Sequence, residues 1–134
     1  MPARILTAAD TPLVRELVAA DPVCNVFVGS RVDAGVLNPT SAGLLWGWPA
    51  EQPRALLHVG ANMVPVATDL SALPAFVEAA GRRRTCQSIV GPSWLAWPLW
   101  QALAARWVTS YQAVREVRRH QPVMALSRQP VGPV

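Results

Sequence analysis

Apolar positions along the chain recur with two different spacings, and the changes between them predict the order of its elements. A short apolar run at residues 4–7 predicts a first strand. Thr11 followed by Pro12 predicts a helix N-cap with proline at the first helical position, and residues 13–18 place their apolar side chains on one face. Asp21 followed by Pro22 repeats the cap and proline pattern, which predicts a second helix that Gly35 ends.

The middle of the chain is dominated by strand-like runs. Residues 44–48, 54–59 and 63–66 are separated by short segments that contain proline or glycine, which predicts three consecutive antiparallel strands. A serine-capped helix with a stripe of apolar residues is expected over residues 71–81, where a glycine ends it. Residues 86–90 then predict a short strand.

The last third of the chain should hold one long helix and one broken strand. The helix is expected from Pro98 onward, with large apolar residues recurring every fourth position at Leu95, Leu99, Leu103 and Trp107. Residues 114–126 predict a strand, which should lie at an edge or form a bulge because Pro122 cannot donate a hydrogen bond within a sheet. We therefore expect one α/β domain over residues 1–126, a mixed sheet with helices on both faces, and a proline-containing tail or start of a linker at 127–134.

Composition narrows this picture to a compact apolar domain. The chain has 134 residues, of which 51% are hydrophobic and 15% charged, so disorder is not expected. Apolar runs stay shorter than the roughly 18 residues of a membrane span, and the first residues are not followed by the core of a signal peptide. We therefore expect a cytoplasmic protein with no membrane partner.

The chemistry-bearing residue types exclude several classes of site. Every basic residue is arginine, which excludes a lysine Schiff base and a P-loop lysine. Cys24 and Cys86 belong to no Cys/His cluster, so two buried thiols are expected rather than a zinc site or a disulfide. His58 lies in an apolar strand and is interpreted as structural, and His120 stands beside two arginines that disfavour its charged form.

The predicted order of elements resembles the GNAT superfamily of N-acetyltransferases, whose fold runs strand, two helices, three-strand meander, helix, strand, helix and closing strands. Several segments are similar to the amino-terminal domain of unknown function found in two-domain GNAT-type N-acetyltransferases of GC-rich bacteria. These segments are DPVCNVFVGSRV (21–32), LWGW (45–48), GANMVPV (60–66), SIVGP (88–92) and VREVR…QP (114–122). The resemblance implies that a complete, acetyl-CoA-binding GNAT domain follows at about the place where this chain stops.

The acetyltransferase chemistry of that superfamily has no counterpart here. The resemblance implies a pyrophosphate-binding loop of the form [Gln/Arg]-x-x-Gly-x-[Gly/Ala] at residues 64–71, but this stretch contains Pro65 and Asp69 and neither glycine nor arginine. The Asp69 carboxylate would repel a phosphate. The superfamily's Leu-Tyr pair on the fourth helix is also missing, because Tyr111, the single tyrosine, lies beyond that helix. We therefore assign no catalytic residue and no metal ligand, and expect no cofactor for this domain alone.

These observations predict a degenerate GNAT-like domain that serves an N-acetyltransferase as a structural, regulatory or substrate-positioning module. The alternative is an acetyl-CoA-dependent N-acetyltransferase with a non-standard cofactor site in the groove between residues 63–66 and 87–90, where Val64, Pro65 and Ser88 are the candidates. Ser88 and Ser93 belong to no Gly-x-Ser-x-Gly elbow, so no hydrolase is indicated.

Two groups of surface residues suggest a partner. Trp94 and Trp97 fall off the buried stripe of their helix and would form an apolar patch, which we expect to dock a catalytic GNAT domain or a second copy of the chain. Arginines cluster at Arg82, Arg83, Arg84, Arg115, Arg118 and Arg119. Together with a net charge of +4, they leave open a second alternative, an arginine-rich module that binds nucleic acid or another anion.

Overall fold

The computed structural model describes residues 1–22, 25–38, 41 and 43–112. The elements in the first half of the chain are β1 (Arg4–Ile5), the 3₁₀ turn η1 (Ala8–Asp10), α1 (Thr11–Ala19), α2 (Val26–Asp33), β2 (Leu44–Trp48) and β3 (Ala55–Val59). Those in the second half are β4 (Asn62–Val66), α3 (Leu73–Ala80), β5 (Ser88–Ile89), α4 (Ser93–Arg106) and α5 (Val108–Tyr111). In the described part of the chain, no helix is both long and apolar enough to cross a membrane.

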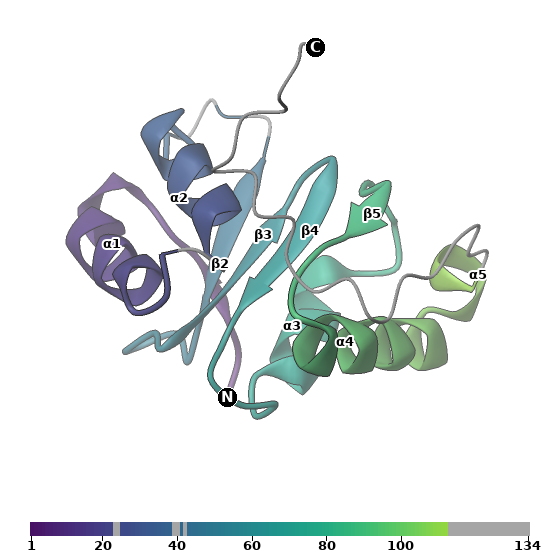
Figure 1. Ribbon diagram of the computed structural model, residues 1–134. Coiled ribbons are helices and arrows are strands. Elements are labelled where there is room, and N and C mark those ends of the chain that lie inside the picture. Colours follow the sequence, from purple (N-terminus) through teal and green to yellow (C-terminus); the bar gives the residue numbers. More distant parts are fainter. Residues whose placement is uncertain (23–24, 39–40, 42, 113–134) are drawn as a thin grey trace, which may run out of the picture.

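The strands form one five-stranded sheet in the order β1-β2-β3-β4-β5 (Figure 1). The pairs β1–β2, β2–β3 and β3–β4 are antiparallel, whereas β5 runs parallel to β4. The three-strand meander and the short strand after α3 are therefore confirmed. The parallel pair is brief, because only Asn62 with Ser88 and Met63 with Ile89 are in register.

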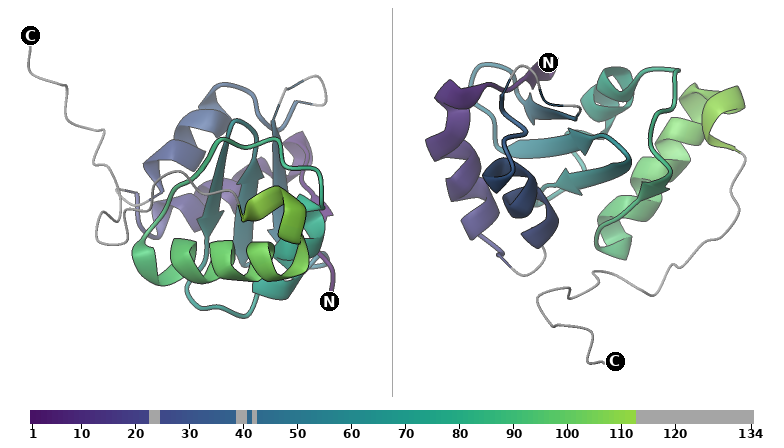
Figure 2. Two further views of the ribbon diagram at one scale, coloured as in Figure 1. Left: turned by 90° about the vertical axis from the view of Figure 1, so that its right-hand side faces the viewer. Right: turned by 90° about the horizontal axis from the view of Figure 1, so that it is seen from above.

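Helices cover both faces of this sheet, as predicted. Helices α1 and α2 lie on one face, and α3 and α4 lie on the other (Figures 1 and 2). Successive side chains of a strand point to opposite faces, so Leu56 packs in the cluster under α1 and α2 while Leu57 packs in the cluster under α3 and α4. Both leucines are completely buried, and each such burial contributes about 1.5–3 kcal/mol to folding.

The first helix begins one residue earlier than the sequence predicts, and the second begins later. Thr11 is the first residue of α1 rather than its cap, and its hydroxyl donates to the carbonyl of Ala8 in the preceding 3₁₀ turn. The second helix begins at Val26 instead of Pro22, because the Asn25 N–H first closes a turn on the Asp21 carbonyl.

Both ends predicted from glycine are close to the observed ones. Gly35 and Gly81 follow α2 and α3 with φ of 93° and 70°. This left-handed region of φ favours glycine, because other residues adopt it at a cost.

The α4 helix begins at Ser93, well before the predicted start, and contains Pro98. The stripe of Leu95, Leu99 and Leu103 explains the difference. All three side chains are buried against the sheet and α3, and Leu95 shares a face with the other two only if the helix already includes it. Core packing therefore outweighs the missing N–H of the proline. The short helix α5 was not predicted, and the expected strand at 114–126 and tail at 127–134 lie outside the described residues.

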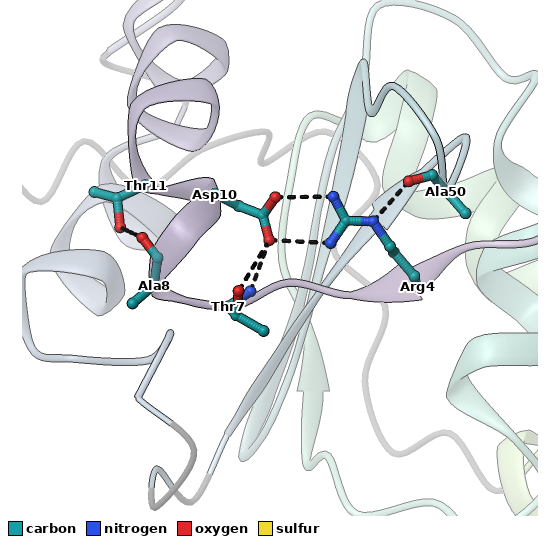
Figure 3. A network of polar contacts seen from close by, with 6 residues as sticks. All are labelled: Arg4, Thr7, Ala8, Asp10, Thr11 and Ala50. Carbon is teal, nitrogen blue, oxygen red and sulfur yellow. Dashed lines mark hydrogen bonds and ion pairs between the residues drawn. The ribbon is translucent and has the colours of Figure 1, made fainter.

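The amino-terminal residues are tied to the sheet by a network around Asp10 (Figure 3). Its carboxylate accepts two hydrogen bonds from the Arg4 guanidinium, at 2.8 and 3.0 Å, and one from the Thr7 N–H at 2.8 Å. Arg4 Nε donates to the carbonyl of Ala50 at 2.6 Å in the loop between β2 and β3. These hydrogen bonds, led by those from Arg4, lower the pKa of Asp10 to about 2.

We predict that Asp10→Asn lowers the free energy of unfolding by about 1–2 kcal/mol near neutral pH, because a two-armed, charge-assisted contact is lost. A carboxyl whose pKa falls from 3.8 to about 2 on folding stabilises the protein above pH 3.8, and this contribution disappears as the pH falls toward 2. Urea unfolding of both proteins between pH 2 and 7 measures the difference.

The matched control is Asp33→Asn, which breaks an ion pair with Arg15 whose side chains are 69% and 54% exposed. The Asp33→Asn variant should lose less than about 0.5 kcal/mol of its free energy of unfolding, as is usual when an exposed ion pair is removed. Equal losses in the two variants, or a loss in Asp10→Asn that does not depend on pH, would contradict the role of Asp10.

Candidate functional site

The region where β4 and β5 run side by side holds the predicted groove residues, but only one of them is accessible. Val64 is 3% exposed and packs under α1 and α2, and Pro65 is also buried. The Pro65 ring lies against Gly91, with its Cδ and Cγ 3.6 Å from where a Cβ of residue 91 would stand. Of the three candidates, Ser88 alone is exposed. Among the described residues, protein atoms therefore fill the inner part of the expected groove.

The turn between β4 and α3 already binds a negative charge of the protein itself. Asp69 Oδ1 accepts a hydrogen bond of 2.9 Å from the Ser71 N–H, and Oδ2 lies 3.4 Å from the Arg54 guanidinium. The hydrogen bonds from Ser71 and the charge of Arg54 lower the pKa of Asp69, so its carboxylate is ionised at neutral pH. Pro74, in the first turn of α3, contributes no N–H.

Three polar side chains meet at the end of the sheet next to the β3–β4 hairpin. Ser88 Oγ donates to Asn62 Oδ1 at 2.5 Å, which joins β5 to β4. The backbone carbonyl of the same Asn62 lies 2.9 Å from Nδ1 of His58 on β3. His58 is only 4% exposed. Among the described residues that are buried, it is the one with a basic side chain.

The hydrogen bond to Asn62 fixes the tautomer of His58. A carbonyl can only accept, so Nδ1 carries the proton and the lone pair of the neutral ring is on Nε2. Burial, and to a smaller extent the positive charge of Arg31, lower the pKa of His58 against the opposing effect of the Asn62 hydrogen bond. The neutral ring is therefore the form present at pH 7.

The surroundings of His58 are tight and apolar. The ring of Phe27 on α2 meets the imidazole edge-on, at a centroid distance of 5.2 Å and an angle of 75°. A Cβ at Gly43 would stand 3.1 Å from Nε2, and one at Gly60 would stand 3.0 Å from Cε1. A side chain at either position would therefore push the imidazole away by a few tenths of an ångström, and glycine lets the backbone approach the ring this closely. This packing supports the structural interpretation of His58.

Cys86 and Tyr111 lie in the other core cluster, under α3 and α4. Burial raises the pKa of the Cys86 thiol, which makes it a poor nucleophile. Burial and the neighbouring Cys86 also raise the pKa of Tyr111 to about 12, although Arg84 acts in the opposite direction. Cys86 is the buried thiol that the sequence predicts, while Cys24 lies outside the described residues.

The two predicted surface groups lie at opposite ends of α4. Trp94 stands in its first turn and is 48% exposed, and Trp97 packs on Trp100 with ring centroids 5.2 Å apart. The arginines at 82–84 follow α3 and lie beside the other end of α4, where Ser110 Oγ contacts the Arg82 carbonyl. A helix of this length extends about 20 Å, so the structure does not bring the tryptophans and these arginines together.

Arg82, Arg83 and Arg84 are all exposed, and Arg84 donates to the Cys86 carbonyl at 2.7 Å. The second arginine cluster, at residues 115–119, and His120 lie outside the described residues. Within the described ranges, no group of three or more His, Cys, Asp or Glu residues is placed to hold a metal ion.

A separate hollow of about 420 Å³ lies beside β1. It is lined by Ile5, Leu6, Thr7, Ala8, Ala9, Val36, Leu37, Asn38, Leu44 and Leu45. None of these residues is titratable, so the hollow offers no ionisable acid or base.

Sequence reasoning missed the part played by Asn62. Its position after Gly60 and Ala61 indicated a turn, and its bond to Ser88 joins residues 26 positions apart. Hydrophobic periodicity carries no information about such a pair. The alignment of β4 with β5 places the two side chains together, and this alignment is a property of the folded sheet.

The position of Tyr111 predicts that it stays protonated far above its ordinary range. Because the chain has a single tyrosine, absorbance at 295 nm should show that only about a tenth of it is ionised at pH 11 in the folded protein, while the protein in denaturant titrates near pH 10. Since folding raises this pKa to about 12, stability should fall as the pH rises from 10 to 12. Tyr111→Phe should reduce that slope, to which the buried Cys86 thiol also contributes, and a folded-state midpoint near 10 would contradict the burial of the Tyr111 hydroxyl.

Comparison with known proteins gives one result. Residues 43–134 match a family described as a domain of unknown function, DUF4081. No curated protein and no solved structure matches the chain. The matched range contains β2 to β5, α3 to α5 and every buried residue of the cluster under α3 and α4. On this match, which covers more than half of its length, the chain belongs to the DUF4081 family.

Proposed function

We propose that the chain is a GNAT-like domain without a cofactor site of its own and that it serves an N-acetyltransferase domain as a structural, regulatory or substrate-positioning module. The order of its elements supports the GNAT-like part of the proposal. One strand, two helices, a three-strand meander, a helix, a strand and a helix follow one another as in the superfamily that the sequence resembles. Order alone does not establish activity, because one fold can host many functions.

The observation that carries the proposal is the Asp69 carboxylate in the turn before α3. In a GNAT enzyme this turn would bind the pyrophosphate of acetyl-CoA through backbone N–H groups at the start of the helix. Here Asp69 takes the Ser71 N–H, and Pro74 removes a donor. A phosphate at this position would meet a fixed negative charge instead of free donors. The usual pose of acetyl-CoA is therefore disfavoured.

Two alternatives have less support. An acetyltransferase that binds acetyl-CoA through the β4–β5 groove would need space that Val64 and Pro65 fill. An arginine-rich module for nucleic acid would be stronger if the exposed Trp94 stood beside the arginines at 82–84, because bases stack on exposed aromatic side chains. Trp94 lies instead at the far end of α4 from Arg82.

The deciding experiment is a thermal-shift titration of the purified chain with acetyl-CoA. A ligand at 100 times its dissociation constant stabilises a protein by about 2.7 kcal/mol, which corresponds to a rise in Tm of about 10 °C for a chain of this size. We expect no shift at 1 mM acetyl-CoA. A reproducible shift that saturates would overturn the proposal and favour the alternative enzyme.

The informative companion is Asp69→Asn, which removes the negative charge and leaves the shape of the turn almost unchanged. If this charge is what excludes phosphate, the variant should gain a measurable response to coenzyme A. Asp33→Asn, which removes an exposed carboxylate at the end of α2, should not. Equal responses of the two variants would show that the charge of Asp69 does not matter.

The partner is expected to contact the first turn of α4, where Trp94 exposes an aromatic side chain suited to the centre of an interface. Trp94→Ser should weaken association at least tenfold, either with a co-expressed acetyltransferase domain or with a second copy of the chain. Light scattering and co-purification measure the two cases. The control is Val108→Ser, which removes an apolar residue 52% exposed near the other end of α4. Unchanged association in Trp94→Ser would contradict this surface.

A further inference from the structure

The contact between α2 and the β3–β4 hairpin has an ionisable group at its centre. His58 lies on β3 between Leu45 on β2 and Val64 on β4. Phe27 covers the ring from α2 at 5.2 Å, and Nδ1 is bonded to the Asn62 carbonyl at 2.9 Å. The ring therefore touches the helix, the hairpin and the neighbouring strand at once.

A proton arriving at this ring must bind Nε2, because Nδ1 already carries one. The new N–H would face the backbone of Gly43 and Gly60, where an added Cβ would stand only 3.1 Å from Nε2 and 3.0 Å from Cε1. The part of the chain that the structure describes forms no hydrogen bond to Nε2. His58 is 4% exposed, so an imidazolium here would be a largely desolvated charge, which is costly.

The charged groups around the ring make this cost larger. Arg31 on α2 is the charged residue that acts on His58, and its guanidinium lies 5.5 Å from the centroid of Phe27, over the face of that ring. From the strands, the ring is faced by Leu45, Val64 and Asn62, which carry no charge. Protonation would therefore place two positive charges on the two sides of one helix–sheet contact, with no described carboxylate between them.

We propose that His58 makes the contact between α2 and the β3–β4 hairpin sensitive to acid: a proton taken up by Nε2 opens this contact and loosens α2 from the sheet. In the open form the imidazolium is hydrated and lies farther from Arg31. The opposite face of the sheet, under α3 and α4, has no part in the change, because it is built on a separate cluster of buried residues. Acid thus acts on one helix layer before it acts on the whole fold.

Hydrogen–deuterium exchange of the full chain tests this proposal. If the open form titrates at the ordinary histidine value of 6.5, the opening equilibrium should rise up to about tenfold between pH 7.5 and 5.5. After correction for intrinsic exchange rates, protection should fall by that factor in α2 and in residues 56–62. Protection in α4 should stay constant over the same interval.

The chain offers a matched pair of variants, because it contains two histidines. His58→Gln should abolish the acid response in α2, since the amide does not titrate in this range, whereas His120→Gln should keep it. Arg31→Gln removes the repelling charge and should make the response smaller. The proposal is overturned if His58→Gln keeps the wild-type response or if the loss of protection is equal in α2 and α4.

A direct titration covers the case in which His58→Gln fails to fold. The Cε1 proton of His58 in the wild-type protein should show by NMR that the ring stays neutral at pH values where a free histidine is already charged. The loss of protection in α2 should begin near the pH at which the open form titrates, above the pH at which the ring in the folded protein takes up a proton. Protonation near pH 6.5 without any change in α2 would equally overturn the proposal.

Discussion

The structure depends on the complete burial of β3 on both of its faces. Residues 55–58 of this strand are at most 4% exposed, and their side chains point alternately toward the two helix layers. A strand of this kind is stable only where apolar side chains cover it on both faces, because opening either face would return a buried leucine to water. The need for helices on both sides follows from this one strand.

The two layers are supplied by different parts of the chain. The layer of α3 and α4 belongs to residues 43–134, which match the DUF4081 family, and its cluster of buried residues lies entirely within that range. The layer of α1 and α2 comes from residues before 43 and adds Leu6, Val14, Val28, Val32, Val36 and Leu37 to the second cluster. Arg4 and Asp10 then hold the start of the chain to the loop between β2 and β3.

The two ends of β4 differ in what they could do. At its carboxyl end, the turn into α3 is occupied by the Asp69 carboxylate and by proline, so the donors that could bind an anion are used within the protein. At its amino end, the Asn62 side chain accepts a hydrogen bond from Ser88, and the Asn62 backbone carbonyl orients the His58 ring. The first arrangement supports a domain without its own cofactor, and the second puts a titratable ring where a helix meets the sheet.

The sequence by itself determined the meander, the helical ends at Gly35 and Gly81, and the lack of glycine before α3, because each is a local matter of periodicity or of backbone freedom. The tertiary structure decided where helices begin. Helix α4 begins early because Leu95 packs in the core. The Asp10 carboxylate forms an ion pair with Arg4.

The folded sheet also decided the site, since it pairs Asn62 with Ser88 and places Trp94 far from the arginines at 82–84. These outcomes depend on contacts between residues distant in the chain. Such contacts arise only when the elements pack together, and a local pattern of apolar and polar residues does not record them.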